Sequence, residues 1–296
     1  MESVKRVKNS EQIPSIYLVS ILAAEKILKK MQSFLKSEKI LLKNDNFFEI
    51  NKKQKILVRK MEFFVPEHKI EDTIANLENI FSSNQKEKLQ GENMDLKEIK
   101  ISHCKSQEWF LDRKEMPVSV FLNIRNDQFH FPFELKLIPC SKQDMFSVEK
   151  IRRGMYDQQP FVYYTFPSEQ YLALAFYVIL NELELLRDLS WYKDIYEMLQ
   201  KEYLEGRKLW EGLHRLMMES PIPSPMKRLE ILQGYQNYGY MRKRWNRQGR
   251  CRQEPYPPWA QVIELLTACI TPVFEAILRD EIYLAEWMPQ FGRYFD

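Results

Sequence analysis

The first pattern along the chain is an apolar stripe at helical spacing. Between residues 15 and 36, apolar side chains recur mostly at steps of three and four with lysines between them, among them Val19, Leu28, Met31 and Leu35. A second stripe with this spacing lies between residues 70 and 81. Because an α-helix turns once in 3.6 residues, both segments are predicted to be amphipathic helices that pack one face on a core.

Shorter apolar runs lie between and after these two helices. Runs rich in Phe, Val and Ile predict five strands, at 47–50, 55–65, 96–102, 118–124 and 129–138. The polar segment 51–54 joins the first two strands in a predicted hairpin, and 125–128 is a turn signal between the last two. The first half of the chain is therefore predicted to run helix, two strands, helix, three strands.

From about residue 166 the pattern is helical almost to the end of the chain. Helices are predicted at 167–186, 190–203, 207–218, 225–245 and 259–287, with proline-rich segments at 221–225 and 255–258 between them. We therefore expect an α+β protein. Residues 1–160 are predicted to form a mixed sheet flanked by helices, and residues 161–296 an α-helical bundle domain.

Composition narrows the classes of function. Lys and Arg number 44 against 41 Asp and Glu, a net charge of +3, so nucleic-acid binding would need a local patch of charge. Of eight glycines only Gly91 lies in the first 150 residues, which excludes a P-loop or a dinucleotide-binding fingerprint there. The four cysteines form no C-x-x-C pair, no signal peptide is recognisable, and charges interrupt every long apolar run. These features predict a cytoplasmic protein with no membrane partner.

Charged side chains on two predicted strands form the candidate site. Lys60 and Glu62 alternate with apolar residues along one strand, so their side chains share a face. Glu134 lies between apolar neighbours in a later strand and is the natural partner carboxylate. Paired carboxylates on neighbouring strands can hold Mg²⁺ for nucleotidyl transfer, so Glu62 and Glu134 are the predicted metal ligands. The alternative is a solvated strand face with ordinary surface ion pairs.

The order of these motifs resembles a known family. The turn Leu42-Lys43-Asn44-Asp45 precedes the Lys60-x-Glu62 strand, and residues 167–175 are similar to a Ser-x-Glu-x-x-x-Ala-x-Lys helix. Lys193-Asp194-Ile195-Tyr196-Glu197 is similar to an Arg-Asp-Leu-Tyr-Asp motif. From about residue 15 to residue 277, the chain resembles the AbiEii-type nucleotidyltransferase toxins of bacterial abortive-infection and toxin–antitoxin systems.

This resemblance implies a nucleotidyltransferase-like domain followed by the helical domain, with Lys60 and Asp194 as catalytic residues beside Glu62 and Glu134. It also implies Mg²⁺ as cofactor and transfer of a nucleotide from NTP to RNA, tRNA or protein in phage defence. An antitoxin or another subunit would be the protein partner.

The chain also departs from the family pattern. Asn44 and Asp45 stand where small turn residues are expected, Lys60 stands at the first metal-binding Asp, and Ala175 at the helix lysine. An ammonium group at position 60 could pair with Glu62 or Glu134 where a metal would otherwise lie. Three hypotheses therefore stay open. The chain is an active transferase, a catalytically silent fold that acts as an RNA- or protein-binding subunit of a larger assembly, or an unrelated structural subunit of such an assembly, which the many aromatic residues late in the chain would favour.

The densest positive charge lies between residues 235 and 252. Its cations are interleaved with Tyr238, Tyr240 and Trp245, and they are Arg242, Lys243, Arg244, Arg247, Arg250 and Arg252. Guanidinium groups match phosphates and aromatic rings stack on unpaired bases, so this segment is a predicted contact for RNA or tRNA ends. The alternative is a helix whose arginines bind groups of the protein itself, while Trp245 packs in the core.

Overall fold

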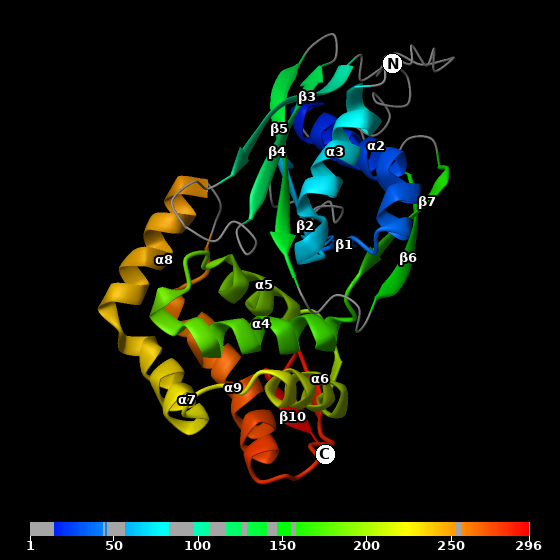
Figure 1. Ribbon diagram of the computed structural model, residues 1–296. Helices are drawn as coiled ribbons and strands as arrows, with labels where there is room; N and C mark the ends of the chain where they lie inside the picture. Colours follow the sequence, from blue (N-terminus) through cyan, green and yellow to red (C-terminus); the bar gives the residue numbers. More distant parts are fainter. Residues whose placement is uncertain are drawn as a thin grey trace. The chain divides into compact units, whose positions relative to one another are not determined.

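The computed structural model describes residues 15–43, 45, 57–82, 98–106, 117–125, 129–140, 147–154, 158–252 and 256–295. The chain divides into two compact units, Met1–Phe166 and Pro167–Asp296 (Figure 1). The division predicted at residue 160 falls at the first residue of a strand, Pro160–Thr165, that belongs to the first unit.

The first unit is built on a mixed sheet whose described strands lie in the order β3-β4-β5-β2-β1-β7-β6. Their bounds are β1 Leu41–Leu42, β2 Lys60–Val65, β3 Glu98–Ser106, β4 Val118–Arg125, β5 His130–Pro139, β6 Val148–Arg153 and β7 Pro160–Thr165. Strand β2 pairs parallel with β5, and β1 parallel with β7, whereas the other neighbours are antiparallel. The predicted α+β class with a mixed sheet is confirmed.

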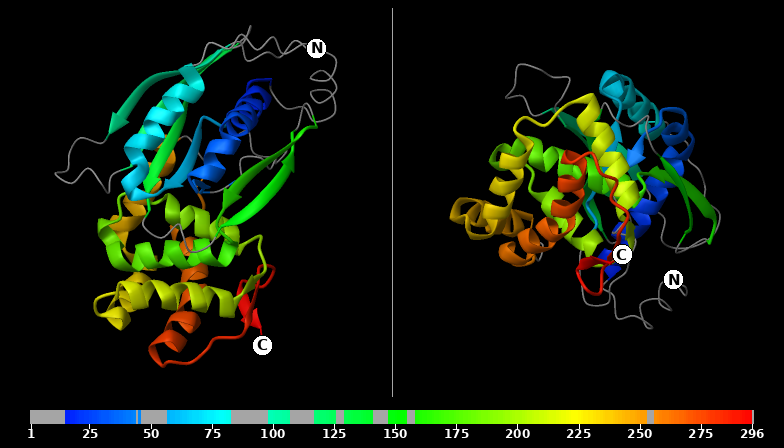
Figure 2. Two further views of the ribbon diagram at one scale, coloured as in Figure 1. Left: turned by 45° about the vertical axis from the view of Figure 1, so that its right-hand side comes forward. Right: turned by 90° about the horizontal axis from the view of Figure 1, so that it is seen from below.

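Two helices, α2 (Ser15–Ser37) and α3 (Ile70–Ser82), flank this sheet, and a short 3-10 turn, η2 (Glu67–Lys69), leads into α3 (Figure 2). Along β2 the side chains alternate, so that Met61 and Phe63 are buried while Lys60 and Glu62 are partly exposed. The buried side chains of this strand share one core cluster with those of the two helices. The charged side chains of β2 therefore lie on the opposite face of the sheet from the core.

The neighbourhood of β2 differs from the predicted hairpin. The predicted strand 47–50 and its turn lie outside the described residues, and β2 begins at Lys60 rather than at residue 55. Its antiparallel neighbour is β1, where Leu41 pairs with Phe64 and Leu42 with Phe63. Sequence periodicity missed β1 because two residues show no alternation, and it missed β6 because that strand has no buried face.

The second unit is mainly helical. Its elements are α4 Ser168–Glu182, η5 Leu183–Leu185, α5 Ser190–Leu199, α6 Gly206–Glu219, α7 Pro225–Gly234, η6 Tyr235–Asn237, α8 Gly239–Arg252 and α9 Trp259–Leu278, with strands β8 Leu204–Glu205, β9 Glu286–Met288 and β10 Arg293–Phe295. The three strands pair as a small antiparallel sheet that the predicted bundle did not include. The helix predicted at 225–245 is broken around η6, where glycines 234 and 239 lower helix propensity on both sides.

Helix α9 is long and apolar enough, by length and composition alone, to cross a membrane. Glu264 and Glu275 interrupt its apolar run, as expected from the sequence, but two charges are too few to exclude a membrane-spanning composition. Half of its most apolar window is buried within the structure, including Leu266, Ile270 and Phe274. The core helix of a folded domain has this same composition, and α9 packs in that way here.

Candidate functional site

The pairing of β2 with β5 places four charged residues on one face of the sheet. In the parallel register Lys60 lies opposite Glu134, and Glu62 lies opposite Lys136. Each of these side chains is partly exposed, while the residues between them are buried. Because side chains alternate along a strand, the four groups form a checkerboard of opposite charges. The predicted site residues Lys60, Glu62 and Glu134 are thus brought together.

Glu62 is the centre of this charged face. Its Oε2 accepts a hydrogen bond from Lys43 Nζ at 2.9 Å, and its Oε1 lies 2.5 Å from Lys60 Nζ and 3.4 Å from Lys136 Nζ. The Lys43 side chain is only 1% exposed and that of Glu62 13% exposed, so the attraction is weakly screened by water. The ion pair expected at position 60 is therefore formed with Glu62, together with two further lysines.

Glu134 has a different partner. Its Oε1 accepts a hydrogen bond from Ser119 Oγ at 2.6 Å, across the antiparallel pairing of β4 with β5. Its backbone N–H donates to the Arg59 carbonyl, which continues the ladder just before β2. The two carboxylates therefore share a face but are held by separate groups.

These side chains do not fit a divalent metal ion. Mg²⁺ binds carboxylate oxygens and tolerates no positive group among its ligands. Here two carboxylates share their surroundings with the ammonium groups of Lys43, Lys60 and Lys136, a local balance of +1. In the part of the chain that the structure describes, no three His, Cys, Asp or Glu side chains are grouped as metal ligands.

Sequence reasoning gave no role to Lys43, Lys136 or Ser119. Lys136 has a visible signal, because it lies two residues after Glu134 and so shares its face. Lys43 has none, since its approach to Glu62 follows from the two-residue pairing of β1 with β2. Ser119 depends on the strand register between β4 and β5, which local sequence does not encode.

A second polar cluster lies around Asp45, at the turn position of the family pattern. Asp45 Oδ2 accepts hydrogen bonds from Tyr163 Oη at 2.6 Å and from Lys150 Nζ at 3.1 Å. Burial, followed by the bond to Asp45, raises the pKa of Tyr163 above its ordinary value. Asp45 therefore ties the turn after β1 to strands β6 and β7, which gives this residue a structural task.

Asp194 lies on α5 in the second unit and is buried. The Tyr171 hydroxyl donates a hydrogen bond to its Oδ2 at 2.9 Å, and the Tyr171 ring stacks on Trp191 with centroids 5.9 Å apart. These contacts join α5 to α4. A catalytic role for Asp194 stays a prediction.

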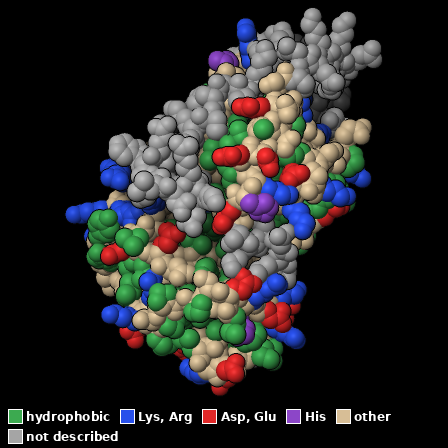
Figure 3. Space-filling model, viewed as in Figure 1, with side chains coloured by type: hydrophobic (Ala, Val, Ile, Leu, Met, Phe, Trp, Pro, Cys, Tyr) green, Lys and Arg blue, Asp and Glu red, His purple; other side chains and the backbone are tan. Residues whose placement is uncertain are grey.

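The basic segment folds as helix α8, and four of its cations form one exposed stripe. Arg242, Lys243, Arg247 and Arg250 are exposed and recur at spacings of one, three, four and eight residues, which places them on the same side of a helix. None of the four forms an ion pair with an acid in the described part of the chain. Figure 3 shows Lys and Arg side chains gathered over the outer edge of α8. We refer to these four residues as the α8 cation stripe.

Two other residues of the segment serve the protein's own structure. Trp245 is fully buried, its Nε1 donates to the Pro257 carbonyl at 2.8 Å, and its ring contacts Tyr256 and Trp259. Arg244 donates to the carbonyls of Glu184 and Leu186, both at 2.6 Å. The nucleic-acid contact predicted for Trp245 and Arg244 is therefore corrected, because a buried ring cannot stack on a base and both guanidinium arms are engaged. Side-chain contacts of Arg252 lie outside the described residues.

No protein-family model matches the chain, and no curated protein matches it significantly. Among solved structures, a protein from H. pylori that is provisionally described as a nucleotidyltransferase is similar at a TM-score of 0.42 and 7% identity, over 88% of this chain and 98% of that one. JHP933 from Helicobacter pylori is similar at a TM-score of 0.36 and 7% identity, over 86% of this chain and 90% of that one. Similarity this weak assigns no function to this chain.

Proposed function

We propose that this chain is a nucleotidyltransferase-like protein that binds RNA and does not transfer nucleotides. The absence of transfer is proposed from the surroundings of Glu62, because the ammonium groups of three lysines lie within 3.4 Å of its carboxylate. A carboxylate neutralised in this way offers no favourable site for a divalent cation, because the ion would meet net positive charge. The two-metal transfer that the family resemblance implies would lack its cation.

The α8 cation stripe supports the RNA-binding part of the proposal. Four exposed cations, which have no acidic partner among the residues that the structure describes, concentrate positive charge on one helix face, whereas the whole chain carries only +3. Counterion release from a phosphate backbone drives binding to such a stripe. From the family resemblance we propose that the chain acts as an RNA-binding subunit in phage defence or toxin–antitoxin function. Its protein partner would be an antitoxin or another subunit.

An active transferase is the second candidate function. The observation that favours it is the strand register, which holds Glu62 and Glu134 on one face of neighbouring strands. In this reading the lysines would bind the triphosphate as point charges while the acceptor is RNA, tRNA or a protein.

A thermal-shift titration with each NTP, with and without Mg²⁺, separates the two functions. We expect no Mg²⁺-dependent stabilisation of the wild-type protein, and the same result for a Glu62→Gln Glu134→Gln control. Metal-dependent stabilisation by one nucleotide that disappears in this control would contradict the proposal and support the transferase.

RNA binding is tested by fluorescence anisotropy with a labelled single-stranded RNA at several salt concentrations. Removing two cations of the stripe, Arg247→Ala with Arg250→Ala, should weaken binding and reduce the slope of log K against log[salt] by about 1.4. The matched control removes Arg207 and Arg215 of α6, which are exposed but pair with Glu211 and Glu219. Equal effects of both double variants would reject a specific role for the stripe.

A further inference from the structure

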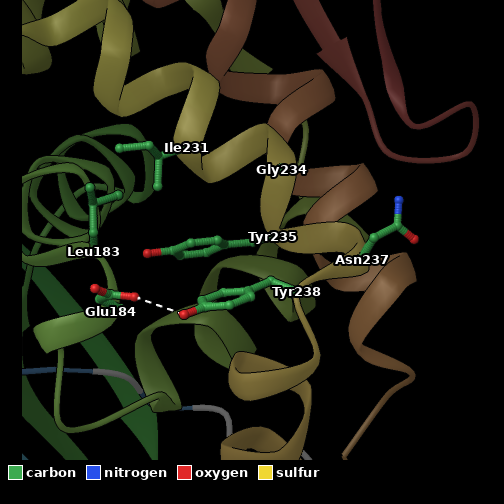
Figure 4. A pocket seen from close by; sticks show the side chains of 7 residues that line it. All are labelled: Leu183, Glu184, Ile231, Gly234, Tyr235, Asn237 and Tyr238. Atoms are coloured by element: carbon green, nitrogen blue, oxygen red, sulfur yellow. Dashed lines mark hydrogen bonds between the residues drawn. The ribbon is translucent and has the colours of Figure 1, made fainter.

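A pocket of about 550 Å³ lies in the second unit beside the start of α8 (Figure 4). Residues of η5, α7 and η6 and the first residue after η6 line it: Leu183, Glu184, Ile231, Gly234, Tyr235, Asn237 and Tyr238. Its volume is within the range of small-ligand sites, and its walls combine apolar surface with a few polar groups. None of these residues takes part in the charged face of the sheet.

Aromatic side chains dominate one wall of the pocket. The rings of Tyr235 and Tyr238 lie nearly parallel, with centroids 5.7 Å apart and an interplanar angle of 28°. Tyr235 is buried, whereas Tyr238 is 39% exposed and has Tyr240 as a further exposed neighbour at 5.9 Å. The pair therefore joins a buried ring to one that solvent, and a flat ligand, can partly reach. Bases of single-stranded nucleic acid stack on such exposed rings.

Polar groups stand at the edge of these rings. The Tyr238 hydroxyl donates to Glu184 Oε2 at 3.2 Å, and Figure 4 shows the Tyr235 hydroxyl pointing to the same side. The Tyr235 hydroxyl is buried and has no hydrogen-bond partner within the described part of the chain. Burial, followed by the charge of Glu184, raises the pKa of Tyr235 to about 12, so this hydroxyl keeps its proton. A ligand that stacks on Tyr238 would thus bring its edge to a carboxylate and an unused hydroxyl.

Arg244 fixes this edge of the pocket. Its two guanidinium contacts, to the carbonyls of Glu184 and Leu186, hold η5 against α8, and its guanidinium also lies 5.7 Å from the Tyr240 ring. Arg244 thus fixes the backbone at Glu184, whose carboxylate accepts the hydrogen bond from Tyr238, and a site whose backbone is already in place costs less to order when a ligand binds.

The pocket is continuous with the α8 cation stripe. The Arg242 backbone N–H donates to the Tyr238 carbonyl at 3.2 Å, so Arg242 lies one helical turn after Tyr238. From Arg242 to Arg250 the stripe extends about 12 Å along the helix axis, at 1.5 Å per residue. A chain of phosphates following the stripe would therefore deliver a base at the tyrosines.

We infer that the pocket at Tyr238 binds one unpaired base of an RNA strand whose phosphates lie on the α8 cation stripe, and that Glu184 selects a base with an exocyclic amine. Cytosine N4 and adenine N6 are amine donors that a carboxylate accepts, whereas uracil has no exocyclic amine. The inference rests on the proposed RNA-binding function. It adds a site and a base preference to it.

The test measures anisotropy of labelled oligo(C) and oligo(U) of about twelve nucleotides, a length that one such surface covers. The full chain should bind oligo(C) more tightly than oligo(U). Tyr238→Ala should weaken oligo(C) binding about 10-fold, which corresponds to about 1.4 kcal/mol for one lost stack, while Tyr238→Phe should bind as the wild type does. Glu184→Gln should reduce the preference for oligo(C). Tyr203→Ala, which removes an exposed tyrosine that does not line the pocket, is the matched control.

Each failure has its own readout. If the wild type binds neither oligonucleotide, the proposed function fails and the inference fails with it. If a variant lacking the four stripe cations loses RNA binding but Tyr238→Ala and Glu184→Gln behave as the wild type, the proposed function stands and the inference is overturned. The pocket would then be a candidate binding site for a protein partner instead of a base. Far-ultraviolet circular dichroism of each variant verifies that the helical unit is folded.

Discussion

At position 62 a single carboxylate balances three lysines, one of which is buried. Replacing Glu62 by Gln keeps the shape of the side chain but removes the negative charge that lies 2.9 Å from the ammonium group of Lys43, whose side chain is 1% exposed. We expect the free energy of unfolding to fall by about 3 kcal/mol, because removing one partner of a buried ion pair uncovers the cost of desolvating the other. Urea denaturation followed by circular dichroism measures this loss.

The control for Glu62→Gln is Glu38→Gln. Glu38 pairs with Lys69 at 2.8 Å, but both side chains are about one third exposed, so water screens the pair. Its loss should cost less than about 1 kcal/mol. Similar losses in the two variants would show that the three lysines do not depend on Glu62.

The buried thiol of Cys269 makes the free energy of unfolding depend on pH. Burial raises the pKa of its thiol from 9.0 to about 12, although a hydrogen bond with Tyr294 opposes this. Because the folded state favours the neutral thiol, its contribution to stability is complete below pH 9 and is lost as the pH rises towards 12. From pH 9 to pH 10 the free energy of unfolding should fall by roughly 1 kcal/mol more in the wild type than in Cys269→Ala. Parallel curves in urea denaturation would refute this.

Helix α8 combines two kinds of arginine on one element. Arg244 faces inwards and donates to two backbone carbonyls, whereas Arg247 belongs to the exposed stripe. Arg244→Ala should lower the free energy of unfolding by about 2 kcal/mol, because the carbonyls of Glu184 in η5 and of Leu186 directly after it lose charged donors. Arg247→Ala should change it by less than about 0.5 kcal/mol. Chemical denaturation compares the two, and a reversed order would contradict the assignment of roles along the helix.

For the whole molecule, the division into two compact units predicts that the second one folds alone. Five of the six tryptophans lie in residues 167–296, and Trp191, Trp245, Trp259 and Trp287 are buried there. A fragment of residues 167–296 should therefore unfold cooperatively, with the blue-shifted tryptophan emission of buried indoles in its folded state. Emission typical of exposed indoles without denaturant would show that this unit depends on the first.

Local sequence was sufficient for several elements whose burial follows a regular period, although β7, whose burial also alternates, was not predicted. The helices at 15–37 and 70–82 and the strands at 118–125 and 130–139 each bury one face, so their apolar residues recur at 3.6 or at two and predict their position closely. The same alternation placed Lys60 and Glu62 on one face of β2. These elements form because they bury an apolar face, and the spacing of neighbouring residues along the chain shows that face directly.

Other features depend on pairings between distant residues, and only the tertiary structure decided them. Lys43 reaches Glu62 through the pairing of β1 with β2, and the β8–β9–β10 sheet joins segments more than 80 residues apart. Two residues of the basic segment likewise have structural roles that only the fold shows: Trp245 is buried, and Arg244 donates to the Glu184 carbonyl of η5. By itself the sequence determined the periodic elements and the charged residue types available. Packing and strand register decided which charges meet, because hydrogen-bond partners across a sheet are not encoded by neighbours along the chain.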